Sequence, residues 1–244
     1  MEGLSGIKVP VFVYSEVAST MDVARDLAES GKTGVVVAER QTRGRGRRGR
    51  DWLSPEGGLY FTLIVRPEIP PPKVPLLSLA SGVAVARAIK KEYGLEVTLK
   101  WPNDVLYVGR KVAGILLEMA PGKNVPRYVL IGIGVNVNHP VSSSEPLGVA
   151  LGEILGKRLS PQELLRVILK ELYAILEDFS PEEILSSWKV LSDTLGQRVR
   201  VACPEGNFTG IACGVDEEGA LILKTEEGRK MRVSVGDCLY LRKA

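Results

Sequence analysis

Residues 97–137 have the sequence VTLKWPNDVLYVGRKVAGILLEMAPGKNVPRYVLIGIGVNV, which contains three runs that favour β-strands. These runs cover residues 97–101, 112–119 and 127–137 and are rich in β-branched and other apolar residues. The links between them are short, and one contains a Gly109-Arg110 turn. Such links favour antiparallel neighbours, because parallel strands need crossover connections that are usually helical. This part of the chain therefore predicts a largely antiparallel sheet.

Helices are predicted on both sides of this region. Residues 20–30 follow an N-cap at Ser19-Thr20 and stop at Gly31, and residues 76–93 have helical periodicity and stop at Gly94. Two more helices, at residues 161–179 and 181–195, have proline near their start, and further strands are expected at residues 9–14, 35–39 and 59–65. The predicted fold class is α+β, with a mixed, largely antiparallel sheet flanked by helices.

From Gly196 the pattern changes to short alternating strands separated by turns such as Glu218-Gly219 and Glu227-Gly228. The expected strands cover residues 198–202, 208–215, 220–224, 230–233 and 239–241. Many short strands within about 50 residues predict a small β-barrel. We therefore expect two domains, residues 1–194 and residues 195–244.

The positive charge of the chain is concentrated in one place. The formal net charge is only +3, yet residues 40–50 alone contain six arginines. A local cluster favours a site for an anion over a generally basic surface that binds nucleic acid.

Other composition features restrict the class of protein. No apolar run approaches the roughly 18 residues of a membrane span, and the start, MEGLSGIKVPVFVYSE, lacks the basic region of a signal peptide. We expect a cytoplasmic protein. The single His139 excludes a histidine triad and is expected to be structural. The three cysteines are expected to be buried thiols, with a disulfide or a reactive thiol as alternatives: Cys203, Cys213 and Cys238.

The arginine cluster lies in the segment QTRGRGRRGR, residues 41–50, between two expected strands. Glycine lets a backbone approach a ligand closely, and arginine supplies forked donors that stay charged. The segment suits a ligand with carboxylate and phosphate groups. A solvated basic loop or an RNA contact is the alternative.

Three further motifs carry candidate chemistry. In the motif KWPND, residues 100–104, a carboxylate could bind Mg²⁺ through oxygen, or the motif could be a plain turn. Lys111 is the first residue of an apolar strand. It could bind a ligand, or it could be an ordinary lysine at a strand edge. The alternating glycines of GIGVNVN, residues 132–138, leave one strand face bare, either for a flat ligand or for a tightly packed helix.

Taken in order, these motifs closely resemble biotin protein ligases over about residues 10–140, and the expected C-terminal barrel resembles the SH3-like domain of that family. The resemblance implies a class II synthetase-like catalytic domain. One departure is Met21, where many relatives have asparagine. The early first strand leaves no room for the DNA-binding domain of some relatives, so the resemblance is to the short type.

The resemblance implies an enzyme that joins biotin to ATP as biotinyl-5′-AMP, releases pyrophosphate, and transfers biotin to a lysine of a biotin carboxyl carrier protein. Mg²⁺ would be the cofactor. The family resemblance also implies a homodimer, with no DNA or membrane partner.

The resemblance assigns roles to individual residues. The biotin-binding residues would be Ser19, Thr20, Gln41, Arg45, Gly46, Arg47, Lys111, Gly114, Gly132 and Gly134. The ATP-binding residues would be Arg48, Trp52, Asn103, Asp104, Lys111 and Asn136. The catalytic residues would be Arg45, Arg48 and Lys111, and Asp104 would bind Mg²⁺.

Two other functions fit parts of the sequence. A lipoate-protein ligase would share the fold and both reaction steps with a different acid. An RNA-binding module could use the arginine segment, but it would need exposed aromatic side chains for stacking, and only Trp52 and Tyr60 lie nearby.

Overall fold

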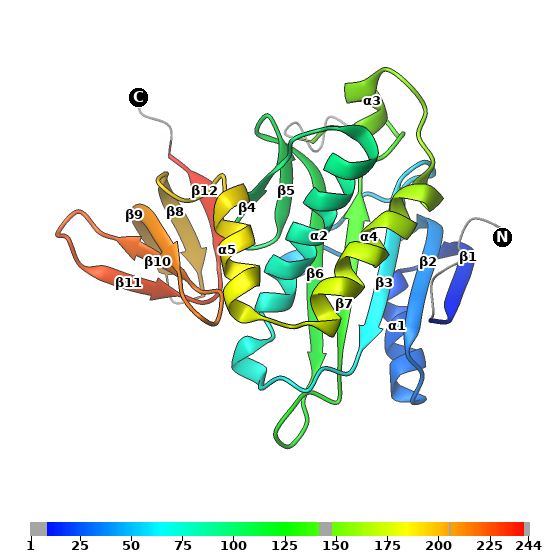
Figure 1. Ribbon diagram of the computed structural model, residues 1–244, viewed down its shortest axis with the longest axis horizontal. Helices are drawn as coiled ribbons and strands as arrows, with labels where there is room; N and C mark the ends of the chain where they lie inside the picture. The colour runs from blue at the N-terminus through cyan, green and yellow to red at the C-terminus, as the bar shows by residue number, and fades with distance from the viewer. Residues whose placement is uncertain (1–8, 142–147, 205, 242–244) are drawn as a thin grey trace.

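The computed structural model describes residues 9–141, 148–204 and 206–241 and contains two β-sheets with helices packed on the larger one (Figure 1). The larger sheet has seven strands in the order β1-β2-β3-β7-β6-β5-β4. Its strands are β1 (Val11–Val17), β2 (Gly34–Gln41), β3 (Leu59–Val65), β4 (Thr98–Lys100), β5 (Asp104–Tyr107), β6 (Arg110–Ala120) and β7 (Tyr128–Val135). Only β1 and β2 pair in parallel, so the predicted mixed, largely antiparallel sheet is confirmed.

The helices cover the two faces of this sheet unequally. Helices α2 (Leu76–Tyr93), α4 (Pro161–Glu177) and α5 (Pro181–Leu191) lie on one face, and α1 (Thr20–Glu29) lies on the other (Figure 1). The small buried residues of α2, Ala80, Ala84 and Ala88, let this helix pack closely. The short α3 (Leu151–Leu155) precedes α4.

Strand β7 shows how the alternation of side chains divides the two faces. Ile131 and Ile133 belong to the main hydrophobic core under α2 and α4, whereas Leu130 belongs to a second cluster with α1. Because alternate residues of a strand share a face, Gly132 and Gly134 lie on the α1 side. A functional pocket on that side is therefore bordered by backbone and not by side chains of β7.

The second sheet is built from the C-terminal residues and has the strand order β11-β10-β9-β8-β12, with every pair antiparallel. Its strands are β8 (Arg198–Cys203), β9 (Gly206–Val215), β10 (Leu221–Lys224), β11 (Lys230–Val233) and β12 (Asp237–Tyr240). The predicted strands are present as an antiparallel sheet, and the barrel is not closed, because β11 and β12 do not pair within the described residues. The link after β11 crosses to β8, where Gly236 lies against Val201 and Cys203, so β12 pairs with β8 instead.

The two sheets are joined through Trp101, which is 2% exposed. Its backbone N–H donates to Thr194 Oγ1 at 2.9 Å, and its indole Nε1–H donates to the carbonyl of Gly219 at 3.0 Å. Next to it, the Lys100 ammonium lies 4.8 Å from the centre of the Tyr240 ring. The tryptophan of the KWPND motif is therefore an anchor between sheets.

Some predicted elements need correction. Strand β5 was not expected, because Asp104–Tyr107 offers only four residues beside a Pro-Asn turn. The predicted helix ends at residues 179 and 195 are too late, since α4 ends at Glu177 and α5 at Leu191. Cys203 and Cys238 are buried as expected, but Cys213 is exposed because it lies on the outer face of β9.

Helix α2 with its preceding turn, Pro71–Tyr93, is the one helical segment of the described chain that is long and apolar enough to cross a membrane. In this structure 72% of its apolar window is buried, as expected of a core helix.

His139 is buried, and burial lowers the pKa of its imidazole. A histidine with a lowered folded-state pKa stabilises the fold only above its unfolded pKa of about 6.5. We expect the free energy of unfolding to fall as pH drops from 7 to 5.5, by at most about 1.4 kcal/mol per pH unit. Denaturant unfolding at several pH values measures this slope. The slope should decrease in His139→Gln, and an unchanged slope would contradict the assignment.

Candidate active site

A cavity of about 100 Å³ lies on the α1 side of the larger sheet, between the start of α1, the arginine segment, β6 and β7. It brings together most of the residues that the sequence assigned to one site. Its lining includes Ser19, Thr20, Met21, Gln41, Arg45, Gly46, Arg47, Trp52, Asn103, Lys111, Gly114, Gly132 and Gly134. The predicted site residues Arg48, Asp104 and Asn136 do not line it.

One end of the cavity holds a hydrogen-bond network centred on Gln41. Its side-chain oxygen accepts from the backbone N–H of Thr20 at 2.8 Å and lies 3.1 Å from the Thr20 hydroxyl. Its amide N–H₂ donates to Ser54 Oγ at 2.8 Å. Thr62 Oγ1 donates to Thr20 Oγ1 at 2.9 Å, and Ser19 caps α1 by accepting from Met21 N–H. The orientation of these groups is therefore fixed by the protein itself.

The glycines of β6 and β7 form one wall of the cavity. Gly114 pairs directly with Gly134, and Gly132 is two residues away on the same face. A Cβ at Gly132 would lie 2.6 Å from Met21 Sδ, and a Cβ at Gly134 would lie 2.4 Å from Trp52 Nε1. The bare strand face is thus covered by Met21, in the first turn of α1, and by Trp52, which follows the arginine segment. The helix-packing alternative therefore applies at Gly132 but not at Gly134.

Lys111 points into the site and does not lie along the sheet edge. Its Nζ is 2.8 Å from Asp104 Oδ1 and 4.9 Å from the centre of the Trp52 ring. The side chain of Lys111 is 28% exposed and that of Asp104 is 22% exposed, so the pair is partly desolvated. Asn136 supports this lysine from behind, because its side-chain amide donates to the Lys111 carbonyl at 3.2 Å.

Arg45 has carboxylate neighbours that the sequence did not reveal. Its Nη2 lies 2.9 Å from Asp22 Oδ1 and 3.3 Å from Glu118 Oε1. Arg25 also contacts both of these carboxylates. The four side chains form a cluster with balanced charge at the edge of the cavity.

Several buried donors at this site lack a well-oriented acceptor. Among the described residues, five buried side-chain polar atoms have no hydrogen-bond partner, and three of them are Arg45 Nε, Arg45 Nη2 and Trp52 Nε1. The ion pair of Arg45 with Asp22 is close but misaligned for a hydrogen bond. Because buried polar groups in folded proteins are nearly always hydrogen-bonded, unsatisfied donors around one cavity indicate that a ligand supplies the acceptors.

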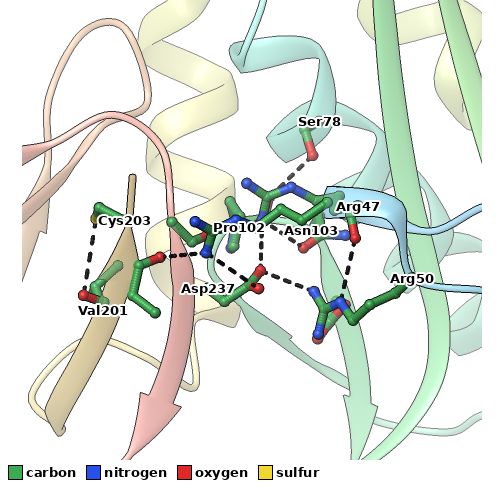
Figure 2. A network of polar contacts seen from close by, with 12 residues as sticks. Arg47, Arg50, Ser78, Pro102, Asn103, Val201, Cys203 and Asp237 are labelled. Atoms are coloured by element: carbon green, nitrogen blue, oxygen red, sulfur yellow. Dashed lines mark hydrogen bonds and ion pairs between the residues drawn. The ribbon is translucent and has the colours of Figure 1, made fainter. Parts of the chain in front are cut away.

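Three other arginines of the segment, Arg47, Arg48 and Arg50, face the C-terminal sheet. Arg47 Nη1 donates to the Gly236 carbonyl at 3.0 Å and to Asn103 Oδ1 at 3.3 Å, and Arg48 Nη1 donates to the Ala202 carbonyl at 2.8 Å. All are near Asp237, at the start of β12 (Figure 2). Arg48 therefore lies outside the cavity, in a wider groove along the arginine segment.

Sequence reasoning missed the groups that hold the site in place. Asp22, Glu118 and Asp237 hold the arginines, and Ser54 holds Gln41. Asp22 and Glu118 lie within recognised elements, but their acidic side chains resemble ordinary surface charges. Asp237 is about 190 residues from the arginines that it contacts. Nothing in the local sequence pattern predicts such contacts.

The cavity combines groups of different chemistry. Its lining holds the neutral hydrogen-bond network of Ser19, Thr20 and Gln41, the glycine wall, and the cations Arg45, Arg47 and Lys111. No group of three or more acidic, histidine or cysteine side chains in the described part of the chain is placed to hold a metal ion. The site suits a flat molecule with a neutral polar head and an anionic tail.

Comparison with known proteins agrees with this site. Residues 14–136 match the biotin/lipoate A/B protein ligase family, and residues 194–240 match the biotin protein ligase C-terminal domain. The bifunctional ligase/repressor BirA of Bacillus subtilis is 36% identical over an alignment of 242 residues that covers 92% of this chain and 74% of that protein. The biotin--[acetyl-CoA-carboxylase] ligase of Mycobacterium tuberculosis is 33% identical over an alignment of 240 residues that covers 93% of this chain and 88% of that protein.

A solved structure shares the whole architecture. The biotin protein ligase from Aquifex aeolicus in complex with biotin and ATP has a TM-score of 0.82 and 32% sequence identity. The match covers 96% of this chain and 99% of that one. The motifs, the cavity and these similarities agree, and the chain therefore belongs to the biotin/lipoate A/B protein ligase family, within its biotin protein ligases.

Proposed function

We propose that this protein joins biotin to ATP as biotinyl-5′-AMP, releases pyrophosphate, and transfers biotin to a lysine of a biotin carboxyl carrier protein or domain. The observation that carries the proposal is that Arg45, Arg47 and Lys111 line the same glycine-walled cavity as Ser19, Thr20 and Gln41. A relative named as a biotin--[acetyl-CoA-carboxylase] ligase supports the proposal, and so does a similar structure solved in complex with biotin and ATP.

The proposed position of biotin follows from the shape of the site. The ureido ring would bind the network of Ser19, Thr20 and Gln41, and the bicycle would lie on the wall of Gly114, Gly132 and Gly134. The carboxylate would then reach the cations, among which Arg45 has two buried donors without an acceptor. Each part of the molecule meets a group of matching polarity.

The first step brings two anions together, the biotin carboxylate and the α-phosphate of ATP. Their repulsion opposes attack of the carboxylate oxygen on phosphorus, and fixed cations in a site with little water reduce it. Arg45, Arg47 and Lys111 would supply that charge, and Gly46 would let the backbone approach. No nucleophile is needed from this protein, since the acceptor lysine attacks the mixed anhydride.

The nucleotide would bind beside Lys111, where Trp52, Asn103 and Asp104 lie. Asn136 would act through the backbone of Lys111, and Arg48 would reach the polyphosphate only by leaving its contact with the C-terminal sheet. In the present arrangement, therefore, neither Asn136 nor Arg48 is placed to contact the nucleotide directly.

We propose Mg²⁺ as the cofactor, held by the triphosphate and by Asp104. One carboxylate plus substrate phosphates is a usual arrangement for Mg²⁺, which fits a site without a larger acidic cluster in its described residues. When bound, Mg²⁺ supplies positive charge to the phosphate oxygens. The ion pair of Lys111 with Asp104 holds both side chains at the place where this charge is needed.

The alternatives are less well supported. A lipoate-protein ligase would share the fold, but the similarity of this chain to biotin ligases extends over the C-terminal sheet. An RNA-binding role would need freely available arginines. Instead, Arg45 is paired with two carboxylates, and Arg47, Arg48 and Arg50 are near Asp237.

The remaining proposals concern organisation. We propose that residues 1–194 form the catalytic domain, that residues 195–244 form the C-terminal domain, and that the protein is a cytoplasmic homodimer. Analytical ultracentrifugation with and without biotin and ATP tests the dimer.

The substrate assignment predicts biotin-dependent exchange of pyrophosphate into ATP that requires Mg²⁺. The assay should be run with biotin, lipoate and octanoate offered separately, with chelator as the metal-free control. Exchange with biotin alone is expected. Exchange with lipoate but not with biotin would overturn the assignment.

For Lys111→Ala we expect slower formation of the adenylate by a factor of about 10² to 10³, because one preorganised cation is lost. Transfer from preformed biotinyl-5′-AMP to the acceptor lysine should be less affected. Single-turnover assays measure each half-reaction, with Lys123→Ala, an exposed lysine outside the site, as the control. Equal damage to both steps, or to neither, would refute the role.

For Gly134→Ala we expect weaker biotin binding in a folded protein, by about tenfold, because the new methyl group forces Trp52 to move and occupies the ligand wall. Isothermal titration calorimetry gives the affinity. The matched control is Gly214→Ala, also in a strand, where no heavy atom lies within 4 Å of the new Cβ. The prediction fails if the two variants bind biotin equally well.

A further inference from the structure

Asp237 stands out as a carboxylate of the C-terminal sheet that contacts the arginine segment of the larger sheet (Figure 2). Its Oδ1 accepts from Arg50 Nη2 at 2.9 Å and lies 3.6 Å from Arg47 Nη1. Its Oδ2 lies 3.7 Å from Arg48 Nη1. One carboxylate thus faces three cations that are close together in sequence.

These three arginines need a counter-ion. Arg47 is the most buried of them, with 19% of its side chain exposed, and the loss of solvent lowers the pKa of its guanidinium. Arg48 and Arg50 lower that pKa further, and the nearby carboxylates Asp237 and Asp104 raise it. Asp237, 24% exposed, therefore offsets both the repulsion and part of the desolvation of Arg47.

The backbone between these arginines also depends on the C-terminal sheet. Arg48, in the short 3-10 helix η2 (Arg47–Gly49), has φ 56° and ψ 38°, a left-handed conformation that is unfavourable for a side chain other than glycine. Such a conformation persists only where surrounding contacts hold it. Two of these contacts, with the Ala202 carbonyl and Asp237, come from β8 and β12.

Arg47 connects these contacts to the cavity. The same Nη1 that donates to the carbonyl of Gly236 also donates to Asn103 Oδ1, and both Arg47 and Asn103 line the cavity. A change at the start of β12 therefore reaches the ligand site through a single side chain.

We propose that Asp237 is a positioning residue for the acyl-adenylate site: it fixes the arginine segment, and Arg47 above all, in the lining of the cavity. This inference rests on the proposed function. It makes the C-terminal sheet part of the ligand site, although β8–β12 contribute no residue to the cavity lining.

The first experiment measures the segment directly and needs no ligand. Limited trypsin digestion, followed by mass spectrometry, gives the rate of cleavage after Arg47, Arg48 and Arg50. Asp237→Asn should be cleaved several-fold faster than the wild type. The matched control, Glu226→Gln, removes an exposed carboxylate of the same sheet that pairs with Arg198, and its cleavage rate should not change.

The second experiment measures retention of biotinyl-5′-AMP. In Asp237→Asn the dissociation rate should rise about tenfold, equivalent to about 1.4 kcal/mol. Asp237→Glu, which keeps the charge, should restore part of the retention. In an Arg47→Ala background the same Asp237 change should add little, because the two residues act in one chain of contacts.

The outcomes separate the inference from the proposed function. If the wild type forms no adenylate from biotin, the proposed function fails, and the digestion result alone still decides whether Asp237 holds the segment. Unchanged digestion and retention in Asp237→Asn, or full additivity with Arg47→Ala, would overturn the inference. If Asp237→Asn does not fold, the wild type is digested at rising salt concentration instead, because salt screens the ion pairs of Asp237. Faster cleavage after these three arginines is expected, and an unchanged rate would contradict the inference.

Discussion

Repulsion among the arginines of residues 40–50 is the constraint around which this structure is organised. Six cations in eleven residues would hold a free chain open and solvated. The fold gathers them by placing carboxylates from α1, β6 and β12 against them, through Asp22, Glu118 and Asp237. Only a closed tertiary structure brings these anions together, so the site and the fold form as one unit.

The glycine wall lowers the local stability of the strands but leaves a bare face on which a ligand can lie. Glycine in the interior of a strand weakens the strand, and two of these glycines face each other across β6 and β7. The buried side chains of Trp52 and Met21 cover this face of the strands. This packing leaves the buried indole N–H of Trp52 without a hydrogen-bond acceptor.

Sequence reasoning predicted the sheet, most helices and most of the cavity because these follow local rules. A run of β-branched and other apolar residues identified β7, an N-cap and a glycine stop bounded α1, and the family resemblance placed Gln41 and Lys111 in one site. It failed where distant parts meet. The open C-terminal sheet depends on where the link after β11 crosses, the role of Trp101 depends on Gly219, and Arg48 faces the C-terminal sheet because Ala202 and Asp237 are there.

The junction at Trp101 has a consequence for how such chains can be recombined in evolution or in the laboratory. Its indole N–H is satisfied by a backbone carbonyl in the turn at Gly219, and its own backbone N–H by Thr194. A C-terminal sheet transplanted from a relative would have to reproduce that turn and supply an acidic residue at the position of Asp237. The two sheets are therefore best regarded as inherited together, and chimeras should be cut elsewhere, at exposed links within one sheet.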